Sequence, residues 1–124
     1  MTTWQNTPLS FSVAPAGPAT VLTLSGAADA AEMSTLRSQF DSLMSETVPK
    51  IILDLTGLIF IGSSGLGLLV EELHRARAGN GDLRLVNANA RICEILETTR
   101  LNDLLPMYAT IGDAVAAPWG NVST

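Results

Sequence analysis

The N-terminal part of the chain alternates apolar and polar residues in the pattern of paired strands. Leu9, Phe11 and Val13 alternate with serines, and this period of two is typical of a strand with one exposed face. A proline- and glycine-containing turn at 15–18 separates this run from a second alternating run at 19–25. The two runs are therefore expected to pair as an antiparallel hairpin.

Two longer segments have apolar residues at helical spacing. The first lies within 32–45, and its apolar positions are Met33, Leu36, Phe40, Leu43 and Met44. The second begins near Ser64, has the apolar positions Leu66, Leu69, Val70 and Leu73, and stops at Gly79-Asn80-Gly81. Both segments are predicted to be amphipathic helices that pack on a sheet.

Short apolar runs between and after these helices predict further strands. Residues 51–55 form a buried strand, and residues 83–86 form the next one. Asn87 or Asn89 caps a third helix, and a short strand precedes a last helix. Helices are thus expected to begin near Ala30, Ser64, Ala88 and Ile111. Parallel strands joined by helices need right-handed crossovers, so the fold class is α/β with a mixed sheet and an antiparallel N-terminal hairpin.

The central stretch contains a specific motif. Asp54-Leu55-Thr56 is followed by Phe60-Ile61 and then by Ser63-Ser64-Gly65-Leu66-Gly67. This arrangement resembles the signature of the STAS family (sulfate transporter and anti-sigma factor antagonist domains), in its small bacterial anti-anti-sigma branch. The resemblance implies one STAS-like domain over 1–124, with its core at about 9–117 and about four helices mainly on one face of the sheet.

The resemblance also implies a switch site. The family signature ordinarily reads D-S-S-G-L-G, and its first serine, the phosphorylation site of the family, matches Ser63. The family's aspartate is replaced by Gly62. This change either removes a residue that the kinase recognises or leaves the protein permanently able to bind. The residues expected to contact a partner are Asp29, Gly62, Ser63, Ser64, Leu66 and Gly67. Asp29 belongs to a corner that resembles the family's G-E-L-D sequence, and a helix cap for the segment at Ala30 explains it equally well.

By this resemblance the protein is a non-catalytic binding module. It would sequester an anti-sigma factor with a kinase-like ATPase fold, and serine phosphorylation would switch that binding off. The alternative is a STAS signalling or scaffold component, stressosome-like or transporter-associated, without direct control of a sigma factor.

Composition narrows the classes of partner. The chain has 124 residues and a formal net charge of −5, so it would repel nucleic acid. No apolar run approaches the length of a membrane span, and no secretory signal is visible at the N-terminus. A cytoplasmic location is the resulting expectation. The expected oligomeric state is a monomer or a weak dimer.

Catalysis and metal binding are not expected. The only histidine, His74, lies eleven residues after Ser63, which is about 16 Å along a helix and too far for proton transfer. The glycines around Ser63 match neither a P-loop nor a dinucleotide fingerprint. Cys93 is alone and is expected in a helix core, without a disulfide or a zinc site. No cofactor is predicted.

Three further expectations concern single positions of the chain. Glu71 and Arg75 have the spacing of an ion pair on one helix. Arg100 stands where the family usually has glycine, and a left-handed backbone there would cost about 1 kcal/mol. Trp119 and residues 121–124 are expected to form a loose end.

Overall fold

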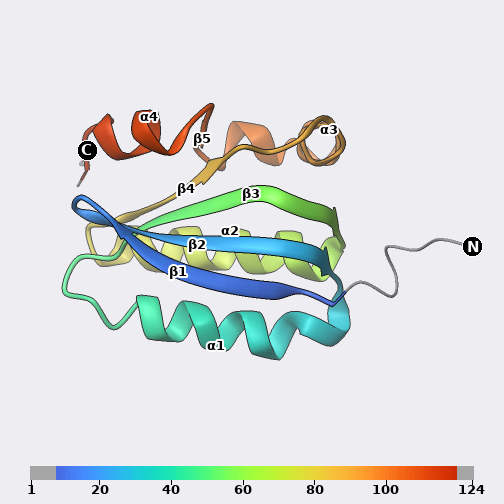
Figure 1. Cartoon of the computed structure of the whole chain (residues 1–124), viewed down its shortest axis with the longest axis horizontal. Helices are drawn as coiled ribbons and strands as arrows, with labels where there is room; N and C mark the ends of the chain where they lie inside the picture. The colour runs from blue at the N-terminus through green and yellow to red at the C-terminus, as the bar shows by residue number, and fades with distance from the viewer. Residues whose placement is uncertain (1–7, 120–124) are drawn as a thin grey trace, which may run out of the picture.

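The computed structural model describes residues 8–119, which form one five-stranded sheet with the strand order β1-β2-β3-β4-β5 (Figure 1). The hairpin of β1 and β2 is antiparallel, whereas the other neighbouring strands are parallel. The strands are β1 (Ser10–Ala16), β2 (Ala19–Ala28), β3 (Lys50–Ile61), β4 (Asp82–Val86) and β5 (Met107–Tyr108). The helical segments are η2 (Ala30–Glu32), α1 (Met33–Leu43), α2 (Ser63–Ala78), α3 (Ala90–Thr98), η3 (Leu101–Asp103) and α4 (Ile111–Ala116). The predicted fold class is confirmed.

The central strand is β3, and it is longer than the predicted segment 51–55. Its first half is buried, as expected for a strand with neighbours on both sides. Its second half contains two irregularities against β2, where β3 has one more residue than its partner each time. After these bulges Ile61 pairs with Ala28, so β2 and β3 end at the same level.

The two faces of the sheet are covered unequally. The larger core cluster joins one face of β3 to side chains from α1, α2 and α3, including Phe40, Leu73 and Leu96. The smaller cluster lies on the opposite face and joins Ile52 to Ala114 of α4. Figure 1 shows α1 and α4 on opposite sides of the molecule. The expectation of helices mainly on one face is therefore confirmed, with α4 as the exception.

Ion pairs connect α1 to α2, and they correct one expectation. Glu71 does not pair with Arg75; it accepts from Arg37 of α1 at 3.0 Å. Arg75 instead donates to Asp41 of α1 at 2.6 Å and lies 3.5 Å from Glu72. Burial raises the pKa of Glu72 despite the opposing effect of the arginines. The packing of α1 on α2 thus brings Arg37 closer to Glu71 than Arg75, which lies one turn away on the same helix.

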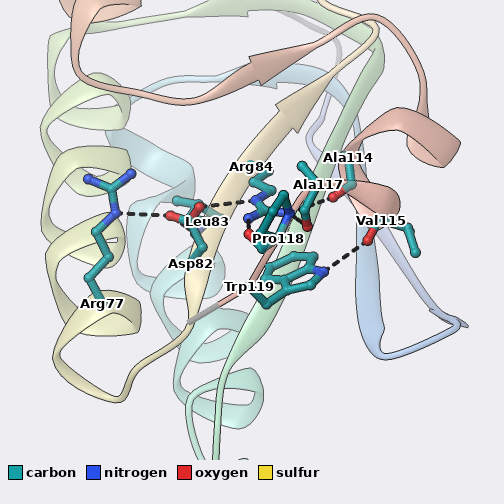
Figure 2. A network of polar contacts seen from close by, with 9 residues as sticks. All are labelled: Arg77, Asp82, Leu83, Arg84, Ala114, Val115, Ala117, Pro118 and Trp119. Atoms are coloured by element: carbon teal, nitrogen blue, oxygen red, sulfur yellow. Dashed lines mark hydrogen bonds and ion pairs between the residues drawn. The ribbon is translucent and has the colours of Figure 1, made fainter. Parts of the chain in front are cut away.

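The end of the described chain is held down by one arginine. Arg84 of β4 is 4% exposed, and its guanidinium donates to the carbonyl groups of Ala114 at 2.7 Å, Ala117 at 2.8 Å and Pro118 (Figure 2). Its Nε donates to Asp82 at 3.0 Å.

The Trp119 ring covers the same guanidinium at 3.7 Å, and its indole N–H donates to Val115 at 3.0 Å. The prediction that Trp119 belongs to a loose end is therefore wrong, because Arg84 fixes this segment through contacts made far along the chain. Residues 121–124, the rest of that prediction, lie outside the described residues.

Arg100 follows α3 with a φ of 64°, in the left-handed region that favours glycine. Arg100 thus adopts the left-handed backbone expected for the family's glycine, although it carries a Cβ. The strained backbone costs about 1 kcal/mol.

Candidate partner-binding site at the start of α2

The carboxyl ends of β2 and β3 bring two predicted site segments together. The Gly62 N–H donates to the Ala28 carbonyl oxygen at 3.0 Å. Asp29, which follows Ala28 directly, therefore lies next to the loop that leads into Ser63. Parallel strands end at the same edge of a sheet, and this edge is the usual position of binding sites in α/β proteins.

Ser63 is the first residue of α2, and its side chain is exposed. Gly62 occupies the N-cap position of this helix, so no side-chain hydrogen bond caps its first turn. Gly62 has extended backbone, with φ −90° and ψ 179°. The Ser63 hydroxyl is thus available at the surface instead of being used as a cap. Ser64 follows it in the first turn and is also exposed.

The two glycines after the serines have different roles. Gly65 is buried, and a Cβ there would lie 2.8 Å from Ile61 Cγ1, so close packing requires the glycine. Gly67 is exposed and a Cβ there would meet nothing within 4 Å. Glycine weakens a helix, and no packing contact of the fold requires it at position 67. Open space above Gly67 leaves room for a partner to approach the backbone.

Leu66 does not belong to the exposed part of the site. Its side chain is 8% exposed and is part of the larger core cluster. It anchors the first turn of α2 in the core, and its contact with a partner stays a prediction.

Asp29 caps the helical segment that follows it. Its carboxylate accepts from the Ala31 N–H at 3.1 Å, in the N-cap position of η2. The structural explanation of this residue is therefore observed. Asp29 is half-buried and follows Ala28, which bonds Gly62, and its contact with a partner remains a prediction.

Ile59 is a surface residue near this site that the sequence did not single out. It is an apolar side chain with 38% exposure, three residues before Gly62. The uninterrupted apolar run at 58–61 concealed it, because such a run does not reveal which side chain turns outward at a bulge. Its side chain is exposed at the second bulge of β3, the strand that leads into Ser63.

The first part of the motif supports the strand. Asp54 Oδ1 accepts from the Thr56 N–H at 3.0 Å, the Thr56 hydroxyl at 2.6 Å and the Asn87 amide at 3.2 Å. Burial tends to raise the pKa of Asp54, but the hydrogen bonds from Thr56 and Asn87 outweigh it and lower this pKa. Asp54 thus joins β3 to the end of β4, and its role is structural.

His74 and Cys93 were the side chains considered for catalysis and metal binding. His74 is exposed on α2, and Cys93 is half-buried and donates to the Ala88 carbonyl at 3.4 Å. Within residues 8–119 no three histidine, cysteine or acidic side chains gather as metal ligands. In the same range, no helix is both long and apolar enough to cross a bilayer.

A cavity of about 430 Å³ lies at the ends of β4 and β5, apart from Ser63. Asn89 is the cap of α3, which decides between the two asparagines proposed from the sequence.

Comparison with known proteins explains this arrangement. The family model of the STAS domain matches residues 11–114. The chain belongs to the STAS domain family. A putative anti-anti-sigma factor of Mycobacterium tuberculosis is 37% identical over 65 residues, which are 52% of this chain and 44% of that protein. The anti-sigma-F factor antagonist RsfA of the same organism is 31% identical over 72 residues, 57% of this chain and 56% of RsfA.

This STAS domain also matches solved structures. An anti-sigma factor antagonist from Mycobacterium paratuberculosis superposes with a TM-score of 0.79 at 23% identity, covering 89% of this chain and 93% of that one. This likeness establishes the fold. The alignments span about half the length of the two curated relatives.

Proposed function

We propose that this STAS domain is an anti-sigma factor antagonist. It binds an anti-sigma factor with a kinase-like ATPase fold, and phosphorylation of Ser63 switches that binding off. The observation that carries the proposal is the exposed hydroxyl of Ser63 at the first position of α2, beside Asp29 and ahead of the open backbone at Gly67. The names of the mycobacterial relatives support the same role.

The switch follows from electrostatics at a helix start. A phosphate adds about 1.5 to 2 negative charges and three acceptor oxygens at one point. The N-terminus of α2 stabilises negative charge, so the modified domain stays folded. A partner that covers the unmodified serine must instead desolvate a dianion, and its affinity falls.

The test replaces each serine in turn. Ser63→Ala should bind the anti-sigma factor as the unmodified domain does and should take up no phosphate from its ATPase. Ser63→Glu should weaken binding by about tenfold or more, because it places a charge inside the interface. Ser64→Ala is the matched control for phosphorylation and should take up phosphate on Ser63 as the unmodified domain does. Calorimetry gives the affinities, and mass spectrometry after incubation with ATP locates the phosphate.

Phosphate on Ser64 or Thr56 would overturn the assignment of Ser63. Tight binding without any phosphorylation would identify an unswitched antagonist. Gly62→Asp then decides what the missing aspartate does. Position 62 has room for a side chain, because a Cβ there would lie 3.5 Å from Phe60 Cε2, an ordinary contact distance. If the aspartate serves kinase recognition, this variant is phosphorylated faster than the unmodified domain.

Gly67→Ala should separate stability from binding. Alanine in an exposed helix interior should raise the free energy of unfolding by about 0.5–1 kcal/mol. The added methyl group should at the same time lower affinity for the partner, because it fills the open space above the backbone. Gly112→Ala is the matched control, since its Cβ also has room and it lies in α4 on the opposite face. Equal affinity of both variants would remove Gly67 from the interface.

The scaffold alternative makes a different prediction. Recovery of the protein from native cytosol in large STAS assemblies, without an ATPase partner, would favour a signalling component instead of an antagonist.

A further inference from the structure

The outer edge of β1 carries no charged side chain that would prevent another strand from pairing with it. Among the described residues no strand lies beside β1 on the side away from β2. Its seven residues, Ser10-Phe11-Ser12-Val13-Ala14-Pro15-Ala16, carry no charge. Exposed edge strands in proteins usually carry charges, prolines or bulges that prevent pairing with another chain. Here only Pro15, near one end, has that effect.

The register of the hairpin determines which backbone groups face outward. Ala16 pairs with Ala19 across the two-residue turn at Gly17 and Pro18, and Pro15 pairs with Thr20. Proline has no N–H to give to β2, so Pro15 belongs to the outward-facing set, together with Phe11 and Val13. The free edge therefore presents the N–H groups of Phe11 and Val13 and the carbonyl groups of Phe11, Val13 and Pro15.

The middle of this edge is also open on the side of the helices. Phe11 packs against the larger core cluster, but Val13, on the same face of the strand, is 51% exposed. Figure 1 shows β1 leaving α1 as it approaches the hairpin turn. An incoming strand thus meets an accessible apolar side chain in the centre of β1.

We propose that this edge is a homodimer interface, in which β1 pairs antiparallel with β1 of a second copy about a twofold axis at Val13. In this register the two Val13 residues exchange both of their backbone hydrogen bonds. On each side, the Phe11 N–H donates to the Pro15 carbonyl oxygen of the other copy. The donor missing at Pro15 leaves only the Phe11 carbonyl unpaired within this seam. The donors and acceptors of β1 thus complement those of a second β1.

Charge favours a second copy over a charged peptide. The chain carries a net charge of −5, yet two β1 strands bring no like charges together at the seam. A charged extended segment from another protein would find no opposite charge on β1. Pairing of one short strand buries less than a standard interface, so the dimer is weak and depends on concentration. In the sheet, β2 lies between β1 and β3, the strand that leads into Ser63, so the proposed switch and this dimer stand or fall independently.

The test measures mass by sedimentation velocity from about 10 µM to about 1 mM protein. The unmodified chain should shift from monomer to dimer across this range. Val13→Pro removes both central donors without breaking a bond to β2 and should raise the dissociation constant about tenfold or more. Val13→Thr keeps the N–H and the branched shape, and it should dimerise like the unmodified chain.

Two charged variants test the same interface in case the proline variant does not fold. Val13→Lys and Val13→Glu should each be more monomeric than the unmodified chain, because like charges would meet across the axis. An equal mixture of the two should recover the dimer, a result that requires Val13 to oppose Val13. An unmodified chain that stays monomeric throughout, or a mixture no more associated than its components, would overturn the proposal.

Discussion

Replacing Arg84 by methionine should lower the free energy of unfolding by about 3–5 kcal/mol, the largest effect expected of any single substitution here. Methionine fills part of the space but donates nothing. The buried carbonyl group of Ala114 and the carbonyl groups of Ala117 and Pro118 would lose their donor. The Trp119 ring would lose the cation that it covers. Urea unfolding followed by circular dichroism measures this change.

Arg77→Met is the matched control for Arg84. Arg77 also donates to Asp82, at 3.0 Å, but its side chain is exposed and bonds no carbonyl group at the end of the described chain. Its loss should cost about 1 kcal/mol or less. The emission of Trp119, recorded in a Trp4→Phe background, should change only in the Arg84 variant. Equal destabilisation by both substitutions would mean that Asp82, and not the C-terminal carbonyl groups, accounts for the role of Arg84.

Replacing Asp54 by alanine should cost about 2–3 kcal/mol at neutral pH. The Thr56 N–H, the Thr56 hydroxyl and the Asn87 amide would lose a charged acceptor together. Asp54→Asn keeps an acceptor oxygen of the same shape without the charge and should fall between alanine and the unmodified chain. Thermal unfolding of the three proteins measures this order.

The pH dependence of the same series tests the cause. The pKa of Asp54 is lower in the folded state than its ordinary value, so its ionised form stabilises the fold above the ordinary pKa. This stabilisation is lost as the pH falls through the folded pKa. The advantage of the unmodified chain over Asp54→Asn should therefore shrink in acid. A constant difference across the acidic range would show that shape, not charge, accounts for Asp54.

Most of the fold could be predicted from the sequence because its signals are local. Period-two alternation identified the hairpin of β1 and β2, and helical spacing identified α1 and α2. The motif around Ser63 identified the turn from β3 into α2. Each of these features depends on residues within a few positions of one another, where propensity and side-chain period act directly. The left-handed backbone at Arg100 was instead indicated by the family's glycine at this position, because arginine itself does not favour that conformation.

The tertiary structure decided the features that depend on distant partners. Glu71 pairs with Arg37, 34 residues away, since helix packing brings α1 closer than the neighbouring turn of α2. At the proposed site, packing buried Leu66 and left Gly67 open, although both lie in one apolar run. Arg84, on β4, donates to the carbonyl group of Pro118, which lies 34 residues further along the chain and after α4. No local pattern encodes such contacts, because they form only after the sheet and its helices have come together.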